Sequence, residues 1–157
     1  MRNTTLCYIE RGREYLLLHR NKKHHDENKD KWVGIGGKFE EGESPEDCLL
    51  REVREETGLQ LTRWRYRAIV TFVSDEWGTE YMHLFTADRW SGTLRGDCEE
   101  GELAWHGKEE LLEKPIWEGD RIVLRLLDTG RPFFSLKLRY RGDCLVEAVL
   151  DGELLPL

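Results

Sequence analysis

The sequence has no long apolar segment, no signal peptide and no cysteine pair with metal-binding spacing. No apolar run approaches the length of a membrane span, and the N-terminus becomes charged at Glu10-Arg11. The chain lacks a CxxC motif, so we expect reduced thiols that mostly serve in packing. These absences predict a cytoplasmic protein without membrane association. The four cysteines are Cys7, Cys48, Cys98 and Cys144.

Positive charge is scarce relative to negative charge. The 157 residues include 24 Lys or Arg and 31 Asp or Glu, which gives a formal net charge of −7 and a pI near 5.3. This balance argues against a nucleic-acid polymer as the partner. It does not exclude a nucleotide, because a bound metal ion inverts the local field of an acidic site.

The length predicts one compact domain over residues 1–157, since a chain of this size can bury one core but hardly two. There is no internal repeat, low-complexity tract or linker. Either a monomer or a homodimer is compatible with the sequence.

One segment concentrates acidic side chains on a single helix face. Glu52, Glu55 and Glu56 stand at i, i+3 and i+4, which places all three on one side of a helix. Three like charges repel each other unless a cation lies among them, and a hard divalent cation prefers oxygen ligands. The alternative is an ordinary solvated face with Arg51 and Glu55 as an i,i+4 ion pair.

The flanking residues predict where this helix begins and ends. Ser44 suits the N-cap, and Pro45 suits the first helical position, where its missing N–H does no harm. Gly58 suits the left-handed conformation that ends a helix. Gly36-Gly37 come before the helix, where a chain without Cβ atoms can turn a backbone carbonyl towards a metal ion.

The complete spacing is more specific than the three glutamates alone. After Gly37, five residues precede Glu43, and seven more precede Arg51-Glu52; the two further glutamates, a glycine and an apolar residue follow. This pattern arises by chance with a probability on the order of 10⁻⁵. It resembles the signature of the Nudix hydrolases without a departure. We call residues 37–59 the acidic box.

This resemblance implies an α/β fold of the mixed α+β kind, an α/β/α sandwich with a mixed central sheet and a catalytic loop–helix–loop. It also implies Mg²⁺, or sometimes Mn²⁺, as the cofactor. Glu43 and Arg51 take the places of residues that orient the metal ligands. The implied ligands themselves are the carbonyl of Gly36 and the carboxylates of Glu52, Glu55 and Glu56.

The implied reaction is hydrolysis of a diphosphate linked to another moiety, by water attack on phosphorus. Glu52, itself an implied ligand, is also the expected general base, because it lies beside the other metal ligands. In some members a loop glutamate serves instead. Here the first candidate is Glu100 and the second is Glu99. Both lie in a stretch that resembles the late metal-binding loop of MutT-like enzymes. Glu100 is therefore also an expected metal ligand, and a solvated acidic loop is the alternative.

A polyphosphate substrate also needs cationic side chains. Lys38 follows the glycine pair directly, and this triplet resembles MutT-like members. Arg20, at the end of a predicted strand, is the second candidate. The alternative for both is an exposed basic residue without a function.

The chain is similar to the MutT-like branch, including the human-type purine triphosphatases, over nearly its whole length. Trp32 is the first residue of the segment before the acidic box that matches this branch. Trp117 and Asp120 resemble the base-binding end, where they would stack on a purine and bond its edge. Core packing is the alternative for Trp117, and a favourable charge at a helix N-terminus is the alternative for Asp120. One position departs: Val33 stands where the human-type enzymes carry an asparagine that reads the oxidised base.

The leading functional hypothesis is a Mg²⁺-dependent nucleoside triphosphate pyrophosphohydrolase, with 8-oxo-dGTP or a related purine deoxynucleotide as substrate. The alternatives are hydrolysis of another nucleoside diphosphate derivative, a non-catalytic nucleotide sensor and a protein-interaction module. The intact acidic box argues against a sensor. No proline occurs between Pro45 and Pro115, which argues against the ADP-ribose hydrolases.

The rest of the chain alternates strand-like and helical patterns. Residues 21–31 have no apolar side chain and predict a loop; the adjacent pair His24-His25 lacks a third metal ligand and is more typical of a surface. Predicted strands are 4–9, 14–20, 61–74, 80–90, 133–140 and 144–150; further helices are 108–114 and 120–128, with a loop at 91–101.

Overall fold

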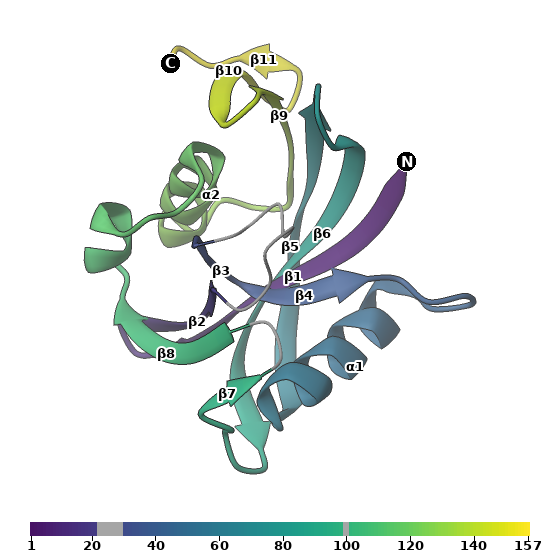
Figure 1. The fold of residues 1–157 in the computed structure, drawn as a ribbon, viewed down its shortest axis with the longest axis vertical. Coiled ribbons are helices and arrows are strands. Elements are labelled where there is room, and N and C mark those ends of the chain that lie inside the picture. The colour runs from purple at the N-terminus through teal and green to yellow at the C-terminus, as the bar shows by residue number, and fades with distance from the viewer. Residues whose placement is uncertain (22–29, 99–100) are drawn as a thin grey trace.

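The computed structural model describes residues 1–21, 30–98 and 101–157, in which one sheet of eleven strands carries two α-helices (Figure 1). The strand order is β11-β10-β9-β5-β6-β1-β2-β8-β7, with β3 paired to β2 and β4 paired to β1. No helix in these residues is long and apolar enough to cross a membrane. The elements are β1 (Arg2–Arg11), β2 (Glu14–Arg20), β3 (Trp32–Val33), β4 (Ile35–Lys38), α1 (Pro45–Thr57), β5 (Gln60–Ser74), β6 (Gly78–Ser91), β7 (Asp97–Cys98), β8 (Gly101–Gly107), the 3-10 turn η1 (Glu110–Glu113), α2 (Glu118–Asp128), β9 (Phe134–Arg141), β10 (Cys144–Leu150) and β11 (Glu153–Leu154).

The sheet is mixed because two of its strand pairs are parallel. β1 runs parallel to β6, with Arg2 opposite Glu80 and Thr4 opposite Met82. β5 runs parallel to β9, whereas β5 and β6 form a long antiparallel hairpin. This mixed α+β arrangement confirms the predicted fold class.

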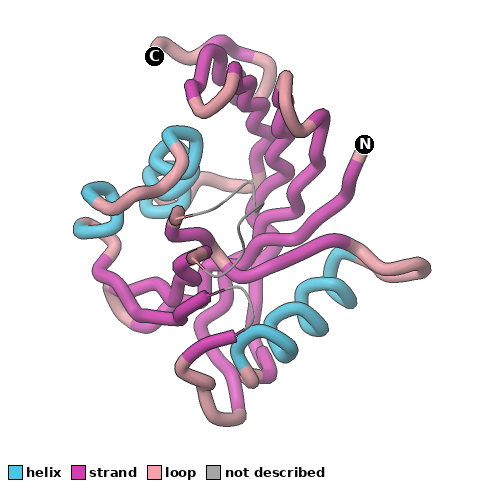
Figure 2. The backbone as a smooth tube through the Cα atoms, viewed as in Figure 1, coloured by secondary structure: helices cyan, strands magenta, loops and turns pink. Residues whose placement is uncertain are grey.

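Side-chain alternation along the central strands gives the sheet two apolar faces. Tyr8 belongs to one core cluster, and its neighbours Cys7 and Ile9 belong to the other, since successive strand residues point to opposite faces. Helix α1 adds Leu49 and Val53 to the second cluster, whereas the apolar side of α2 packs in the first. The two α-helices therefore cover opposite faces of the sheet, as Figure 2 shows.

The segment after residue 91 is not the plain loop that the sequence predicts. It contains β7 and leads into β8, an unpredicted strand that pairs antiparallel with β2. Strand β8 forms because it pairs with β2, which is far away in the sequence. A local sequence pattern does not predict such a pairing. The predicted helix at 108–114 is also wrong, because only the short turn η1 forms there. The other predicted strands and helices are present, with no end more than two residues from its predicted position.

The two glycines before α1, Gly36 and Gly37, lie in strand β4. A Cβ on Gly36 would stand 1.9 Å from the carbonyl oxygen of Thr5 in β1, which is closer than any side chain allows. Glycine is therefore required by the close approach of two strands, not by a left-handed conformation. This contact holds the start of the acidic box against the centre of the sheet.

The cysteines with described side chains carry free thiols. Cys7 and Cys48 are buried and Cys144 is exposed. Burial raises the pKa of the Cys7 thiol well above its usual range, which suits a packing residue.

Candidate active site

Both ends of α1 are capped as the sequence predicts. Ser44 Oγ accepts a hydrogen bond from the Asp47 amide at 3.0 Å, and Asp47 Oδ2 accepts one from the Ser44 amide at 3.0 Å. At the other end Gly58 adopts a φ of 81°, and its amide donates to the Arg54 carbonyl. These caps fix the acidic face of α1, which packs beside β4.

Arg51 gathers three of the predicted acidic residues around one guanidinium. Its Nε and Nη2 donate to the two oxygens of Glu43 at 2.7 and 2.9 Å, a bidentate contact. Its Nη1 donates to Glu52 Oε1 at 2.8 Å and to Glu55 Oε2 at 3.3 Å. Nη2 also donates to the Lys38 carbonyl at 3.0 Å, which ties the helix to β4.

This guanidinium fixes the charge state of Glu43. Hydrogen bonds from Arg51 lower the pKa of the Glu43 carboxyl to about 2, against the opposing effect of partial burial, and the Glu40 amide adds to the lowering. The same pair raises the pKa of Arg51 above its usual range. Glu43 therefore stays ionised at neutral pH with both oxygens engaged, which suits an orienting residue better than a proton acceptor.

Glu52 and Glu56 lie directly beside the two glycines of β4. Glu56 is buried, and its Oε2 accepts a hydrogen bond from the Gly36 amide at 3.0 Å. A Cβ on Gly37 would stand 2.6 Å from the carboxylate of Glu52, so the glycine leaves the space that this carboxylate fills. Both acids thus approach one short piece of backbone from the helix.

The donor types fit a hard divalent cation, although the donors do not meet at one point. Carboxylates and a backbone carbonyl offer only oxygen. Among the described residues, no three Asp, Glu, His or Cys side chains lie close enough together to hold an ion. Glu52 and Glu55 accept hydrogen bonds from Arg51, and Glu56 accepts one from the Gly36 amide. The Glu55 side chain is 56% exposed, so it has room to turn towards an ion beside the other two.

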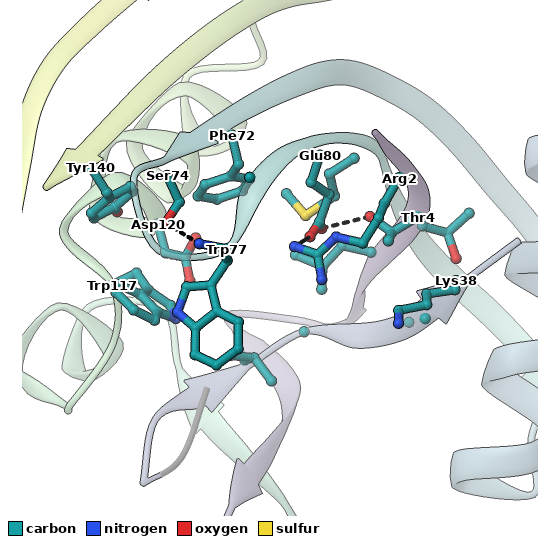
Figure 3. Close-up of a pocket in the computed structure, with 18 of the residues that line it drawn as sticks. Arg2, Thr4, Lys38, Phe72, Ser74, Trp77, Glu80, Trp117, Asp120 and Tyr140 are labelled. Carbon is teal, nitrogen blue, oxygen red and sulfur yellow. Dashed lines mark hydrogen bonds and ion pairs between the residues drawn. The ribbon is translucent and has the colours of Figure 1, made fainter. Parts of the chain in front are cut away.

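A cavity of about 220 Å³ extends from β4 to α2 (Figure 3). The β4 glycines and Lys38 line it at one end, and Arg20 from the end of β2 also lines it. Trp117 and Asp120 line it at the other end. Four predicted substrate-binding residues, from β2, β4 and the start of α2, therefore share one cavity.

The α2 end of the cavity combines aromatic rings with a buried carboxyl. Trp117 meets Tyr140 edge-on with ring centroids 5.3 Å apart, and the Gly119 amide donates to the Tyr140 hydroxyl at 2.8 Å. Asp120 is 5% exposed, and the residues that the structure describes form no hydrogen bond to its carboxyl. Burial raises the pKa of Asp120 to about 7, against the lowering effect of Arg121. Near neutral pH this carboxyl can therefore donate as well as accept.

Replacing Asp120 with asparagine should stabilise the fold more at pH 8 than at pH 5. The folded-state pKa is raised from 3.8 to about 7, so between these values the native carboxyl keeps a proton that the unfolded chain has lost. Wild-type stability therefore falls as the pH rises through this window, and asparagine removes the effect. We expect the gain at pH 8 to exceed the gain at pH 5 by on the order of 2 kcal/mol. Urea unfolding at both pH values measures it, with the exposed Asp143→Asn as the control. Equal gains at both values would contradict a proton held by Asp120.

Two of the predicted site residues, Trp32 and Glu100, are not among the described residues that line the cavity. The Trp32 ring stacks on His19 at 4.6 Å and meets His106 edge-on at 4.3 Å. Glu99 and Glu100 lie outside the described residues, as does the pair His24-His25.

Several residues that line the cavity are not predicted from the sequence. Phe72 and Ser74 are alternate residues of β5, and Glu80 and Met82 are alternate residues of β6. Trp77 lies in the turn between these strands. Period-two alternation shows that each pair shares a face, but only the strand order shows which face meets the cavity.

Comparison with known proteins identifies the class of this protein. The NUDIX domain family matches residues 1–127. The chain therefore belongs to the NUDIX domain family, and it is a hydrolase acting on pyrophosphate bonds. Nudix hydrolases generally use divalent metal ions, in agreement with the oxygen donors on α1 and β4.

Three similar proteins cover most of the chain. The uncharacterized Nudix hydrolase YvcI of Bacillus subtilis (strain 168) is 31% identical over 157 residues, covering 91% of this chain and 95% of YvcI. The oxidized purine nucleoside triphosphate hydrolase of Danio rerio is 29% identical over 126 residues, covering 77% of this chain and 78% of that protein. The crystal structure of a mutator MutT protein from Bacillus halodurans has a TM-score of 0.85 and 27% identity, covering 98% and 99% of the two chains.

Proposed function

We propose that this hydrolase cleaves a nucleoside triphosphate to a nucleoside monophosphate and pyrophosphate, with 8-oxo-dGTP or a related purine deoxynucleotide as its substrate. The observation that carries the proposal is the single cavity that joins Lys38 and the β4 glycines to Trp117 and Asp120. A ligand that fills both ends needs an anionic part and a flat part with hydrogen-bonding edges, and a nucleotide has both. The Danio rerio relative, an oxidized purine nucleoside triphosphate hydrolase by name, supports a purine.

The β4 end would bind the polyphosphate and the metal ion, for which we propose Mg²⁺, with Mn²⁺ as the alternative. When bound, such an ion neutralises phosphate oxygens and lowers the pKa of the attacking water. Lys38 and Arg20 line the cavity and supply positive charge to the phosphates. The proposed ligands are the Gly36 carbonyl and the carboxylates of Glu52, Glu55 and Glu56.

Glu52 is the proposed acceptor of the water proton. Its carboxylate lies against Gly37 and takes one hydrogen bond from Arg51, which orients it. Glu43 is the poorer acceptor, because its pKa is held at about 2 and it orients Arg51 instead. Glu100 remains the second candidate, both as a base and as a metal ligand, although it lies outside the described residues.

The α2 end would bind the base. Trp117 brings to the cavity an aromatic ring that could stack on a base, with Lys31 Nζ 4.9 Å from its centroid, and Asp120 brings a carboxyl that can donate or accept near neutral pH. Oxidation of a purine changes which edge atoms carry hydrogen, so a carboxyl with a pKa near 7 can match either pattern. Asp120 is therefore compatible with an oxidised purine, and the name of the Danio rerio relative is what favours one.

A nucleotide panel tests the proposed function. Purified protein with Mg²⁺ is offered 8-oxo-dGTP, dGTP, other triphosphates, dinucleotide polyphosphates and sugar nucleotides, and both products are identified. We expect 8-oxo-dGTP to give the highest kcat/KM and to release pyrophosphate rather than orthophosphate. Preferred cleavage of a dinucleotide or sugar nucleotide would favour the second candidate, a hydrolase of another nucleoside diphosphate derivative. Binding without any hydrolysis would favour a nucleotide sensor, although Glu52, Glu55 and Glu56 are all retained.

The second candidate is favoured by one residue, Val33. Its side chain is buried and lines the cavity, so it offers no hydrogen bond where the human-type enzymes carry an asparagine. Replacing Val33 with asparagine should raise the preference for 8-oxo-dGTP over dGTP by about 10-fold, since a buried amide then discriminates between the base edges. The ratio of the two kcat/KM values measures it, with Val33→Thr as the matched polar control. An unchanged ratio would show that position 33 does not face the oxidised edge.

We also propose that the substrate is a free nucleotide rather than a nucleic-acid polymer, since the net charge of −7 repels a polyanion. We further propose that the protein is cytoplasmic and that it is a monomer or a homodimer.

A further inference from the structure

A three-residue polar cluster lines the cavity apart from the acidic box. Arg2 Nη2 and Glu80 Oε1 are 2.8 Å apart, and Thr4 Oγ1 donates to Glu80 Oε2 at 2.8 Å. All three residues line the cavity. They come from the paired strands β1 and β6, where Arg2 stands directly opposite Glu80. The parallel register therefore fixes this cluster on rigid secondary structure.

The cluster lies along the cavity between its two proposed binding ends. Figure 3 shows Arg2, Thr4 and Glu80 between Lys38 on one side and the group around Trp117 on the other. A nucleotide with its phosphates near Lys38 and its base near Trp117 would have its sugar at this position.

The chemistry of the cluster selects what it can bind. A carboxylate is an unfavourable neighbour for a polyphosphate, but Arg2 balances the charge of Glu80. Each carboxylate oxygen has acceptor capacity beyond one hydrogen bond, so Glu80 can accept another from a ligand. Phosphate oxygens that are ionised at neutral pH have no hydrogen to donate. The complementary ligand group is therefore a donor, and a sugar hydroxyl is the donor that a nucleotide carries between its base and its phosphates.

We propose that Glu80, held by Arg2 and Thr4, accepts a hydrogen bond from the 3′-hydroxyl of the substrate sugar and is a specificity residue of this hydrolase. The proposal rests on the proposed nucleotide substrate. The 3′-hydroxyl is chosen because a deoxynucleotide carries no other hydroxyl on its ring. Hydrogen bonds to charged groups are the stronger kind in proteins. Glu80 thus favours substrates with a free 3′-hydroxyl over those that lack it.

A cycle of two substrates and two proteins isolates this contact. Wild type and Glu80→Gln are assayed on dGTP and on 2′,3′-dideoxy-GTP, which differ only in the 3′-hydroxyl. We expect the substitution to lower kcat/KM on dGTP by about 10-fold, mainly through KM, because a charged acceptor becomes a neutral one. On the dideoxy substrate we expect a change of less than about twofold, since there is no hydroxyl to lose. Calorimetric binding of dGMP and 2′,3′-dideoxy-GMP gives the same comparison without turnover.

Controls separate the outcomes. Glu76→Gln makes the same chemical change at an exposed residue of the same hairpin, outside the cavity lining, and should leave both substrates unaffected. Thermal unfolding confirms that Glu80→Gln is folded; glutamine can still accept from Thr4. Equal losses on both substrates would overturn the proposal in favour of a structural role. A loss on dGTP that is absent on dITP would also overturn it, because Glu80 would then bind the 2-amino group of the base. If wild type neither cleaves nor binds any of these nucleotides, the proposed function fails, and this inference fails with it.

Discussion

Replacing Glu56 with glutamine should lower turnover by about 100-fold or more while the fold stays intact, because even groups that only support a metal site typically contribute 10- to 100-fold. Glu56 is buried and bonded to the Gly36 amide, so glutamine can keep that hydrogen bond through its carbonyl oxygen. What glutamine removes is the negative charge that would hold a divalent ion. The Mg²⁺ concentration for half-maximal activity should therefore rise along with the loss of kcat. Pyrophosphate release at several Mg²⁺ concentrations measures both effects.

Glu55→Gln should behave in the same way, since both acids project from the same helix face. The matched control is Glu41→Gln, an exposed glutamate of the loop before α1 that is not part of the acidic spacing. This control should retain wild-type turnover and the wild-type dependence on Mg²⁺. Near-wild-type pyrophosphate release by both Glu55→Gln and Glu56→Gln would contradict the proposed metal ligands.

Replacing Gly36 with alanine should lower the free energy of unfolding by more than about 3 kcal/mol, a loss at the upper end of overpacking effects. The new methyl group would stand 1.9 Å from the Thr5 carbonyl oxygen, which belongs to the backbone of β1 and cannot move aside on its own. Relief of the clash requires β4 to separate from β1, where Gly36 lies opposite Leu6. Urea or thermal unfolding measures the loss.

The neighbouring Gly37→Ala is its matched control, with a different expected result. Here the methyl group would stand 2.6 Å from the Glu52 carboxylate, which is the far end of a flexible side chain and can turn away. We expect a stability loss below about 1 kcal/mol together with a fall in turnover of about 10-fold or more, because Glu52 leaves its position. If Gly36→Ala proves as stable as wild type, strand β4 does not pack against β1 as described. If Gly37→Ala keeps full activity, the position of Glu52 is not critical.

The acidic box could be predicted from the sequence because its structure is local. Helical periodicity places Glu52, Glu55 and Glu56 on one face, and the caps at Ser44 and Gly58 depend only on residues within a few positions. The family model and the relatives confirm the class of hydrolase that this spacing predicts. The site roles of the individual residues stay predictions, which the substitutions above test.

The structural reason for the two β4 glycines could not be predicted. The sequence suggests only that a chain without Cβ atoms can present a backbone carbonyl to a metal ion here, and the structure adds that both residues lie in a strand. Their requirement for glycine comes from the Thr5 carbonyl and from the Glu52 carboxylate, which approach from other elements. Likewise, β8 exists because β2 offers it a pairing edge more than 80 residues earlier in the chain.

The sequence by itself determined the class of hydrolase and the acidic helix face whose oxygen donors suit a divalent metal ion. These depend on one helix and the short segment before it, where 3.6-residue periodicity and end capping fix the geometry locally. Only the tertiary structure decided the shape of the substrate cavity. Its walls combine β1, β5, β6 and the start of α2, and the order and register of the strands bring Glu80 and Asp120 into one space. Sheet pairing is a long-range interaction, so the chain pattern can show which residues share a strand face but not what that face meets.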